Sequence, residues 1–232
     1  MTRIRFQRSL DELKENLLVM AGLAEQAIQR AIEAYRVRDL SICDLVSRSE
    51  NAINRLERDI DQSALDLLAM EQPMAIDLRF ILGVIKINAD LERVGDAAKS
   101  ISDRVRNMEQ MAVAELPVDI PRMATLAAEM VRKSLQSFIE ADAEIARSVL
   151  RMDDAVDAMN RAAYKALTKV MEEQSHIAPQ ALNALMISRS LERVADHATN
   201  IAEDVIFWVQ GDDVRHHKSI AAQKEKEAKA AG

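Results

Sequence analysis

An internal repeat constrains the fold of this chain of 232 residues more than any other feature. Residues 91–98 read LERVGDAA and residues 191–198 read LERVADHA, and an isoleucine follows each copy at the same offset (Ile101 and Ile201). Self-similarity at a fixed offset marks repeated structural units, so we expect two related halves. A Glu-x-x-x-Asp pair recurs in the repeat. It places Glu92 beside Asp96 and Glu192 beside Asp196 on one helix face.

The rest of the pattern is helical. Hydrophobic residues make up 49% of the chain and aromatic residues only 3%, a composition typical of helical bundles. The apolar periodicity predicts six long helices, at residues 4–38, 41–71, 75–109, 119–142, 144–173 and 178–209. Short connections favour antiparallel neighbours. We expect Asp39 or Ser41 to cap the second helix, Asp119 to cap the fourth, and Ser175 to help cap the sixth.

The longest break, around residues 110–118, divides the chain. We therefore predict a first unit over residues 1–110, a second over residues 111–217, and a charged flexible tail over residues 218–232.

Charge and cysteine content restrict the class of protein. The net charge of −7 argues against nucleic-acid binding, which needs a basic surface. The single cysteine, Cys43, cannot form an internal disulfide, which favours a reducing compartment, and we interpret it as a small buried residue. No apolar run approaches the ~18 residues of a membrane span, and the charged N-terminus does not resemble a signal peptide. We expect a cytoplasmic protein that touches membranes only through partners.

The helix at 75–109 is apolar on two sides. One side carries Phe80, Val84, Ile87, Leu91, Val94, Ala98, Ile101 and Val105. The opposite side begins with Leu78, Ile81, Leu82, Ile85 and Ala89 and then turns acidic at Glu92, Asp96 and Asp103. In the helix at 178–209, Ala181, Leu182 and Leu185 lead in the same way into Glu192, Asp196 and Glu203. Such helices are expected to lie between neighbours, with carboxylates partly covered and paired with Arg93, Arg193 or hard metal cations.

The segments LERVGDAAKSI, SLERVADHATNI and FWVQGDDVRH resemble the PhoU family of accessory proteins in phosphate-specific transport. The resemblance implies an all-α fold of two pseudo-symmetric antiparallel three-helix bundles, with metal clusters at the Glu(Asp)-x-x-x-Asp pairs. It also implies a cytoplasmic negative regulator of phosphate uptake and of the phosphate-starvation response. Its partners would be the ATPase subunit of the phosphate ABC transporter and a sensor histidine kinase, and a homodimer is consistent with this role.

The same resemblance implies a second acidic pair facing the first in each half. The matching stretches give Glu50 and Asn54 in the first half, and Asp153 and Asp157 in the second. Asn54 brings an amide oxygen but no charge, so the site in the second half is expected to be the better one. Asp103 and Glu203 are candidate extra ligands. The sequence leaves the cation open among iron, zinc, manganese, magnesium and calcium.

Two alternatives remain at this point. Clustered acids can hold two metals for hydrolysis, so a metal-cluster-dependent enzyme is a second hypothesis, although neither a glycine-rich phosphate loop nor a Ser-His-Asp set stands out. The third hypothesis is a scaffold whose acids are solvated and paired with arginine, as exposed acids usually are. Among the histidines, we interpret His176 as a loop residue, His197 as a helical surface residue, and His216 and His217 as tail residues, none of them ligands.

Overall fold

The computed structural model of the chain describes residues 2–71, 73–212 and 214, and this part is built from helices and loops without strands. The prediction of six long helices is confirmed. They are α1 (Thr2–Val37), α2 (Leu40–Glu71), α3 (Ala75–Asn107), α4 (Ile120–Glu140), α5 (Ala143–Glu173) and α6 (Ala178–Gln210), with a single 3₁₀ turn, η1 (Ser175–Ile177), before α6. Each predicted boundary lies within two residues of the observed one.

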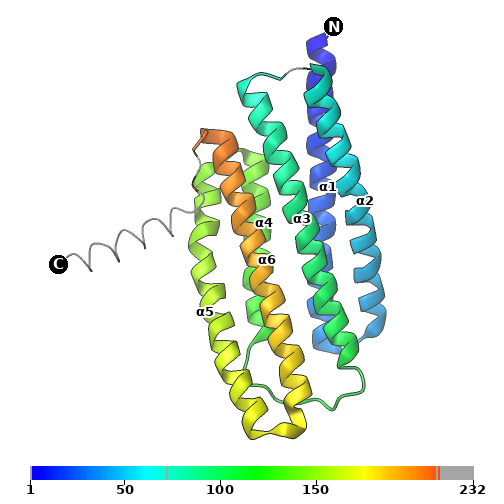
Figure 1. Ribbon diagram of the computed structural model, residues 1–232, viewed down its shortest axis with the longest axis vertical. Coiled ribbons are helices and arrows are strands. Elements are labelled where there is room, and N and C mark those ends of the chain that lie inside the picture. The colour runs from blue at the N-terminus through cyan, green and yellow to red at the C-terminus, as the bar shows by residue number, and fades with distance from the viewer. Residues whose placement is uncertain (1, 72, 213, 215–232) are drawn as a thin grey trace, which may run out of the picture.

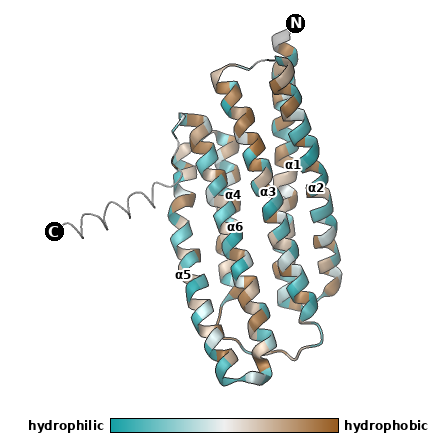
Figure 2. Ribbon diagram, viewed as in Figure 1, coloured by the Kyte–Doolittle hydropathy of each residue, from teal (hydrophilic) through white to brown (hydrophobic). Residues whose placement is uncertain are grey.

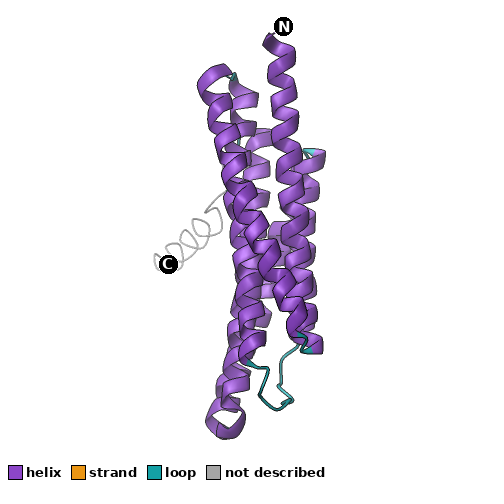
Figure 3. Cartoon of the chain, turned by 90° about the vertical axis from the view of Figure 1, so that its right-hand side faces the viewer, coloured by secondary structure: helices purple, strands orange, loops and turns teal. Residues whose placement is uncertain are grey.

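The helices form two pseudo-symmetric antiparallel three-helix bundles, as expected. Helices α1, α2 and α3 pack on one another, and so do α4, α5 and α6. The bundles lie side by side along their length, with α3 running antiparallel to α6 at the seam (Figure 1). Helix α1 also packs on α4, so two pairs of helices join the halves. The connection between α3 and α4 is the longest loop and lies at one end of the elongated molecule (Figure 3).

Short acidic side chains begin three of the helices. Asp39 Oδ1 accepts a hydrogen bond from Ser41 N at 2.8 Å, and Asp119 Oδ1 accepts one from Arg122 N at 3.0 Å, as predicted. Asp142 caps α5 in the same way, which the sequence prediction missed. The expected role of Ser175 is wrong. It lies in η1 with His176, and no side chain caps α6, whose second residue is Pro179. Proline has no N–H to satisfy there, so a cap is less needed.

One hydrophobic core runs through both halves. Apolar and polar residues alternate along the helices (Figure 2), so that each helix buries one face. The predicted inner stripe of α3 is buried from Val84 to Val105. The opposite stripe is less covered than predicted, because Leu78, Leu82 and, on α6, Leu182 are 38%, 39% and 50% exposed.

The seam between α3 and α6 contains buried polar contacts. Asp90 Oδ1 lies 2.8 Å from His197 Nδ1 and accepts a hydrogen bond from Asn200 Nδ2 at 3.1 Å. The prediction of His197 as a surface residue is therefore wrong, since the residue is 8% exposed. The apolar pattern of α6 alone does not indicate this burial, because the helix that covers His197 is α3, which belongs to the other half. A second, partly buried contact joins Lys86 Nζ to Asp204 Oδ1 at 2.9 Å.

Other predictions have mixed outcomes. Cys43 is buried, as interpreted from the sequence. None of the described helices combines the length and apolar character that crossing a bilayer requires. The predicted tail and both of its neighbouring histidines, His216 and His217, lie outside the described residues. The predicted boundaries of the two units remain a prediction.

Candidate metal centre

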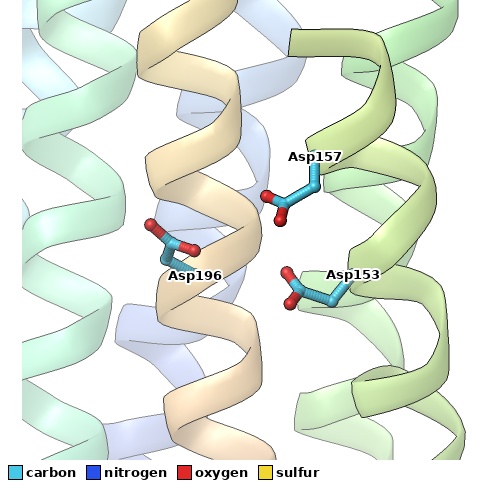
Figure 4. Close-up of side chains that lie close together, drawn as sticks. All are labelled: Asp153, Asp157 and Asp196. Atoms are coloured by element: carbon cyan, nitrogen blue, oxygen red, sulfur yellow. The ribbon is translucent and has the colours of Figure 1, made fainter. Parts of the chain in front are cut away.

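Three carboxylates converge between α5 and α6. Asp153 and Asp157 reach from α5 toward the helix that carries Asp196 (Figure 4), and the nearest carboxylate oxygens of the three residues all lie within 4.8 Å of one another. Among the described residues, no other group of three acidic, histidine or cysteine side chains meets this criterion. The predicted facing pairs are therefore adjacent in the second half.

Helical spacing explains how the site is assembled. Asp153 and Asp157 are four residues apart, so their side chains project from the same face of α5. Glu192 and Asp196 have the same relation on α6. Val156 and Leu191, which are fully buried, fix the rotation of the two helices, and the acidic faces meet beside the core.

The electrostatics show that the carboxylates crowd one another. Burial raises the pKa of Asp196, and the negative charges of Asp153 and Asp157 raise it further, whereas His197 and Arg193 act in the opposite direction. Burial also raises the pKa of Glu192, with Asp196 and Asp157 contributing and Arg189 opposing. At the cluster, Arg161 Nη1 forms an ion pair with Asp157 Oδ2 at 3.3 Å. The carboxylates thus act on one another as well as on their arginine neighbours.

This donor set fits a hard cation. Three carboxylates supply only oxygen ligands, which magnesium, manganese, calcium and iron accept in proteins. A bound cation would neutralise the charges that raise the pKa values of Asp196 and Glu192.

The first half contains a related but different set. Glu92 and Asp96 lie on α3, and Glu50 and Asn54 lie on α2. Asn54 Nδ2 donates a hydrogen bond to Glu50 Oε1 at 2.6 Å, while Asn54 Oδ1 is buried without a hydrogen-bond partner in the described structure. That oxygen is available as a neutral ligand. Burial raises the pKa of Glu92, as do Asp96 and Glu57, against the charge of Arg93.

Glu57 is the residue that the sequence prediction missed. It lies one turn after Asn54 on α2 and acts electrostatically on Glu92. The offset of 103 residues that relates Glu50 to Asp153 and Asn54 to Asp157 also relates Glu57 to Asn160. The halves therefore exchange an amide and a carboxylate: Glu, Asn and Glu on α2 correspond to Asp, Asp and Asn on α5. Extending the alignment by one turn would have revealed this signal.

A comparison with protein-family models identifies this architecture. The PhoU domain model matches residues 17–105 and residues 120–205, one match in each bundle. The chain belongs to the PhoU family.

Curated relatives and solved structures agree with this assignment. The chain is 36% identical over 213 residues to the phosphate-specific transport system accessory protein PhoU homolog of Pseudomonas aeruginosa, covering 91% of this chain and 88% of that one. It is 31% identical to the accessory protein PhoU of Serratia marcescens, covering 95% and 90%. The crystal structure of PhoU from Pseudomonas aeruginosa superposes with a TM-score of 0.87 at 35% identity, over 89% of this chain and 100% of that one. That of the phosphate transport system regulatory protein PhoU from Streptococcus pneumoniae gives 0.83 at 29% identity, over 90% and 99%.

All ten predicted site residues lie inside the two PhoU domain matches, but they do not form one set. Asp103 forms an ion pair with Lys99, one turn before it on α3, and is not part of a cluster of three. Glu203 is half-buried on α6 and does not belong to the cluster of Asp153, Asp157 and Asp196 either. The role of these two residues as additional ligands therefore stays a prediction.

The repeated segments at residues 91–98 and 191–198 border a common hollow at the seam. It has a volume of about 640 Å³ and is lined by both acidic and basic side chains. Its lining comes from α3 and α6 and consists of Glu92, Arg93, Asp96, Arg193, Asp196, His197, Thr199 and Asn200. Glu92 and Asp96 of the first half therefore face the same hollow as Asp196 of the second half.

Proposed function

We propose that this chain is a cytoplasmic regulator of phosphate homeostasis that restrains phosphate uptake and represses the phosphate-starvation response. The observation that carries the proposal is the PhoU domain match in both bundles, with curated accessory proteins of phosphate-specific transport matching 91–95% of the chain. Its partners are the ATPase subunit of the phosphate ABC transporter and a sensor histidine kinase. Long helices with charged faces provide suitable docking surfaces.

The acidic clusters are proposed to hold divalent or trivalent cations. Asp153, Asp157, Asp196 and Glu192 form the site of the second half. Glu50, Asn54, Glu92 and Asp96 form that of the first, together with Glu57. The oxygen-only donors and the mutual repulsion of the carboxylates support this role. The chain's own contribution is to hold these oxygens in place and to shape the surface that partners contact.

The regulatory role is tested with a phosphate-starvation reporter such as alkaline phosphatase, in a strain that lacks the gene and grows in ample phosphate. We expect high output without the gene and low output once the intact gene is restored. Normal repression in a strain without the gene or a second copy would contradict the proposal.

The cation site is tested by elemental analysis of the purified chain and of the double variant Asp153→Asn/Asp157→Asn. We expect the double variant to lose most of the cation of the second half. Asp154→Asn is the matched control, because Asp154 is an exposed neighbour on α5 outside the cluster. Equal cation content in all three proteins would contradict the site. Size measurement by light scattering tests the proposed homodimer.

A further inference from the structure

A groove between α5 and α6 extends from the acidic cluster toward the C-terminal end of α5. It has a volume of about 610 Å³, which is within the size range of small-molecule sites. Four cationic side chains line it, two from each helix, and we call it the basic groove. Its lining consists of Asn160, Arg161, Tyr164, Lys165, Leu185, Met186, Arg189, Glu192, Arg193 and Asp196.

The four cations form two facing rows. Arg161 and Lys165 lie one turn apart on α5, and Arg189 and Arg193 lie one turn apart on α6. Four residues of helix rise about 6 Å, which is longer than one phosphate group and suits a chain of two or more. Arginine is the side chain best shaped to bind phosphate oxygens in pairs.

The lining of the basic groove is only partly repeated in the first half. The positions equivalent to Tyr164, Lys165 and Arg189 are Asp61, Gln62 and Ala89, by the offsets that relate the two bundles. The first half therefore replaces two cations and an aromatic ring with an acid and two uncharged side chains. Pseudo-symmetry explains the acidic clusters of both halves and the arginines Arg58 and Arg93, but it does not explain the two further cations and the tyrosine of the second half.

The groove also has an apolar part and an acidic end. Leu185 and Met186 line it and are half-buried, and Tyr164 is 59% exposed at its edge. Glu192 and Asp196 would repel a bare polyanion, so an anion in the groove has to bring a divalent cation. Magnesium is commonly held by one or two carboxylates together with the phosphates of a ligand.

We propose that the basic groove binds a molecule carrying a chain of two or more phosphate groups, together with magnesium. The phosphates lie between the two cationic rows, and the magnesium lies at the acidic end. This location of the magnesium rests on the proposed cation site, whereas the contacts to the four cations do not. The phosphate chain can belong to a nucleotide, with its base against Tyr164 and Met186, or to inorganic polyphosphate.

The test is calorimetric titration of the full chain with magnesium and, in separate arms, ATP, tripolyphosphate and orthophosphate. The groove variant is Lys165→Glu/Arg189→Glu. The matched control is Arg55→Glu/Arg58→Glu, which makes the same charge change at exposed positions on α2. All four residues are exposed, and thermal melts verify that each variant remains folded.

We expect ATP or tripolyphosphate to bind the intact chain. Loss of one charge-assisted contact weakens binding about tenfold, so the groove variant should lose at least that factor. The control variant removes no contact in the groove, so its affinity should change by less than about twofold. Tighter binding of ATP than of tripolyphosphate identifies a nucleotide, and equal binding identifies an inorganic chain. No binding of either ligand, or equal weakening in the groove and control variants, overturns the proposal.

Failure of the cation site gives a different result. One such result is that elemental analysis finds no cation in the chain, while the phosphate chain still binds in EDTA and fails to bind the groove variant. In that case the role of the cationic rows stands, and only the role of magnesium is overturned. If cations bind but the phosphate chains do not, the proposed function stands and the basic groove proposal is wrong.

Discussion

At the scale of single residues, Asp196 shows the conflict between binding and stability. Its carboxylate faces two others from α5, and both raise its pKa. Like charges at such distances destabilise the folded chain unless a cation lies between them. We therefore expect Asp196 to reduce stability in the cation-free protein and to increase it when the proposed cation is bound.

We expect Asp196→Asn to raise the melting temperature of the cation-free protein by about 1–3 °C, through relief of repulsion. The same change should remove most of the rise in melting temperature that added cation produces. Calorimetry with and without cation measures both effects, and Asp154→Asn is again the control. A lower melting temperature in the cation-free variant would show that repulsion is not the dominant effect.

The same raised pKa values predict a pH dependence. A carboxyl group whose pKa is raised in the folded state stabilises the fold at low pH, and this stability is lost as the pH rises through the raised pKa. Asp196, Glu192 and Glu92 all belong to this class. Cation binding requires ionised carboxylates, so it strengthens over the same interval. We expect the difference in melting temperature between loaded and cation-free protein to grow from about pH 5 to pH 7. A constant difference would contradict the site.

At the scale of elements, the contact between α3 and α6 depends on buried polar groups. Asp90 satisfies both His197 and Asn200 across the seam. Asp90→Ala leaves two donors without their partner, so we expect a loss of about 2–4 kcal/mol in the free energy of unfolding. Denaturant titration measures it. Asp44→Ala, which removes an exposed pair with Arg106, should cost about 0–1 kcal/mol. Equal costs would mean that the seam does not rely on this network.

Helices α2 and α3 pack closely together at Gly95. A Cβ atom at this position would lie 2.9 Å from Ile53 Cδ1 and 3.4 Å from Ile53 Cγ2, whereas Ala195 occupies the equivalent position on α6. Alanine favours the helix by about 0.5–1 kcal/mol, but the added methyl group overpacks the site.

Ile53→Val should therefore cost about 0.5–1.5 kcal/mol in the parent chain and less, or nothing, together with Gly95→Ala. A double-mutant cycle of unfolding free energies measures the coupling. Additive effects would show that Ile53 already has room for the methyl group.

The elements themselves could be predicted from the sequence, and much of the site could not. Six helices and the caps at Asp39 and Asp119 follow from local periodicity and turn chemistry. The repeat drew attention to Glu192 and Asp196, whereas Asp153 and Asp157, which face them, followed from the resemblance to the PhoU family. His197 was misjudged because its burial depends on a helix of the other half. The exposure of Leu82 and the approach of Glu57 to Glu92 likewise depend on how helices pack, which periodicity along one helix does not encode.

At the scale of the whole molecule, the two bundles share one core. Buried residues from all six long helices belong to one contiguous cluster that crosses the seam. Neither half can unfold without exposing apolar surface of the other. We expect one thermal transition whose calorimetric and van't Hoff enthalpies agree, although chains above about 150 residues often depart from this behaviour. Two separate transitions would show that the predicted units at residues 1–110 and 111–217 are independently stable.

The exchange of Asn54 and Glu57 for Asp157 and Asn160 makes the two halves unequal. Two identical, independent cation sites would fill over the same concentration range, and the single cation of a half-filled chain would favour neither half. Unequal sites differ by about 1.4 kcal/mol for each tenfold ratio of affinities, and between the two midpoints the chain with one filled half is the most populated form. With the proposed cation sites, the duplicated fold would thus pass through three states as the cation concentration rises, and the middle one would be asymmetric.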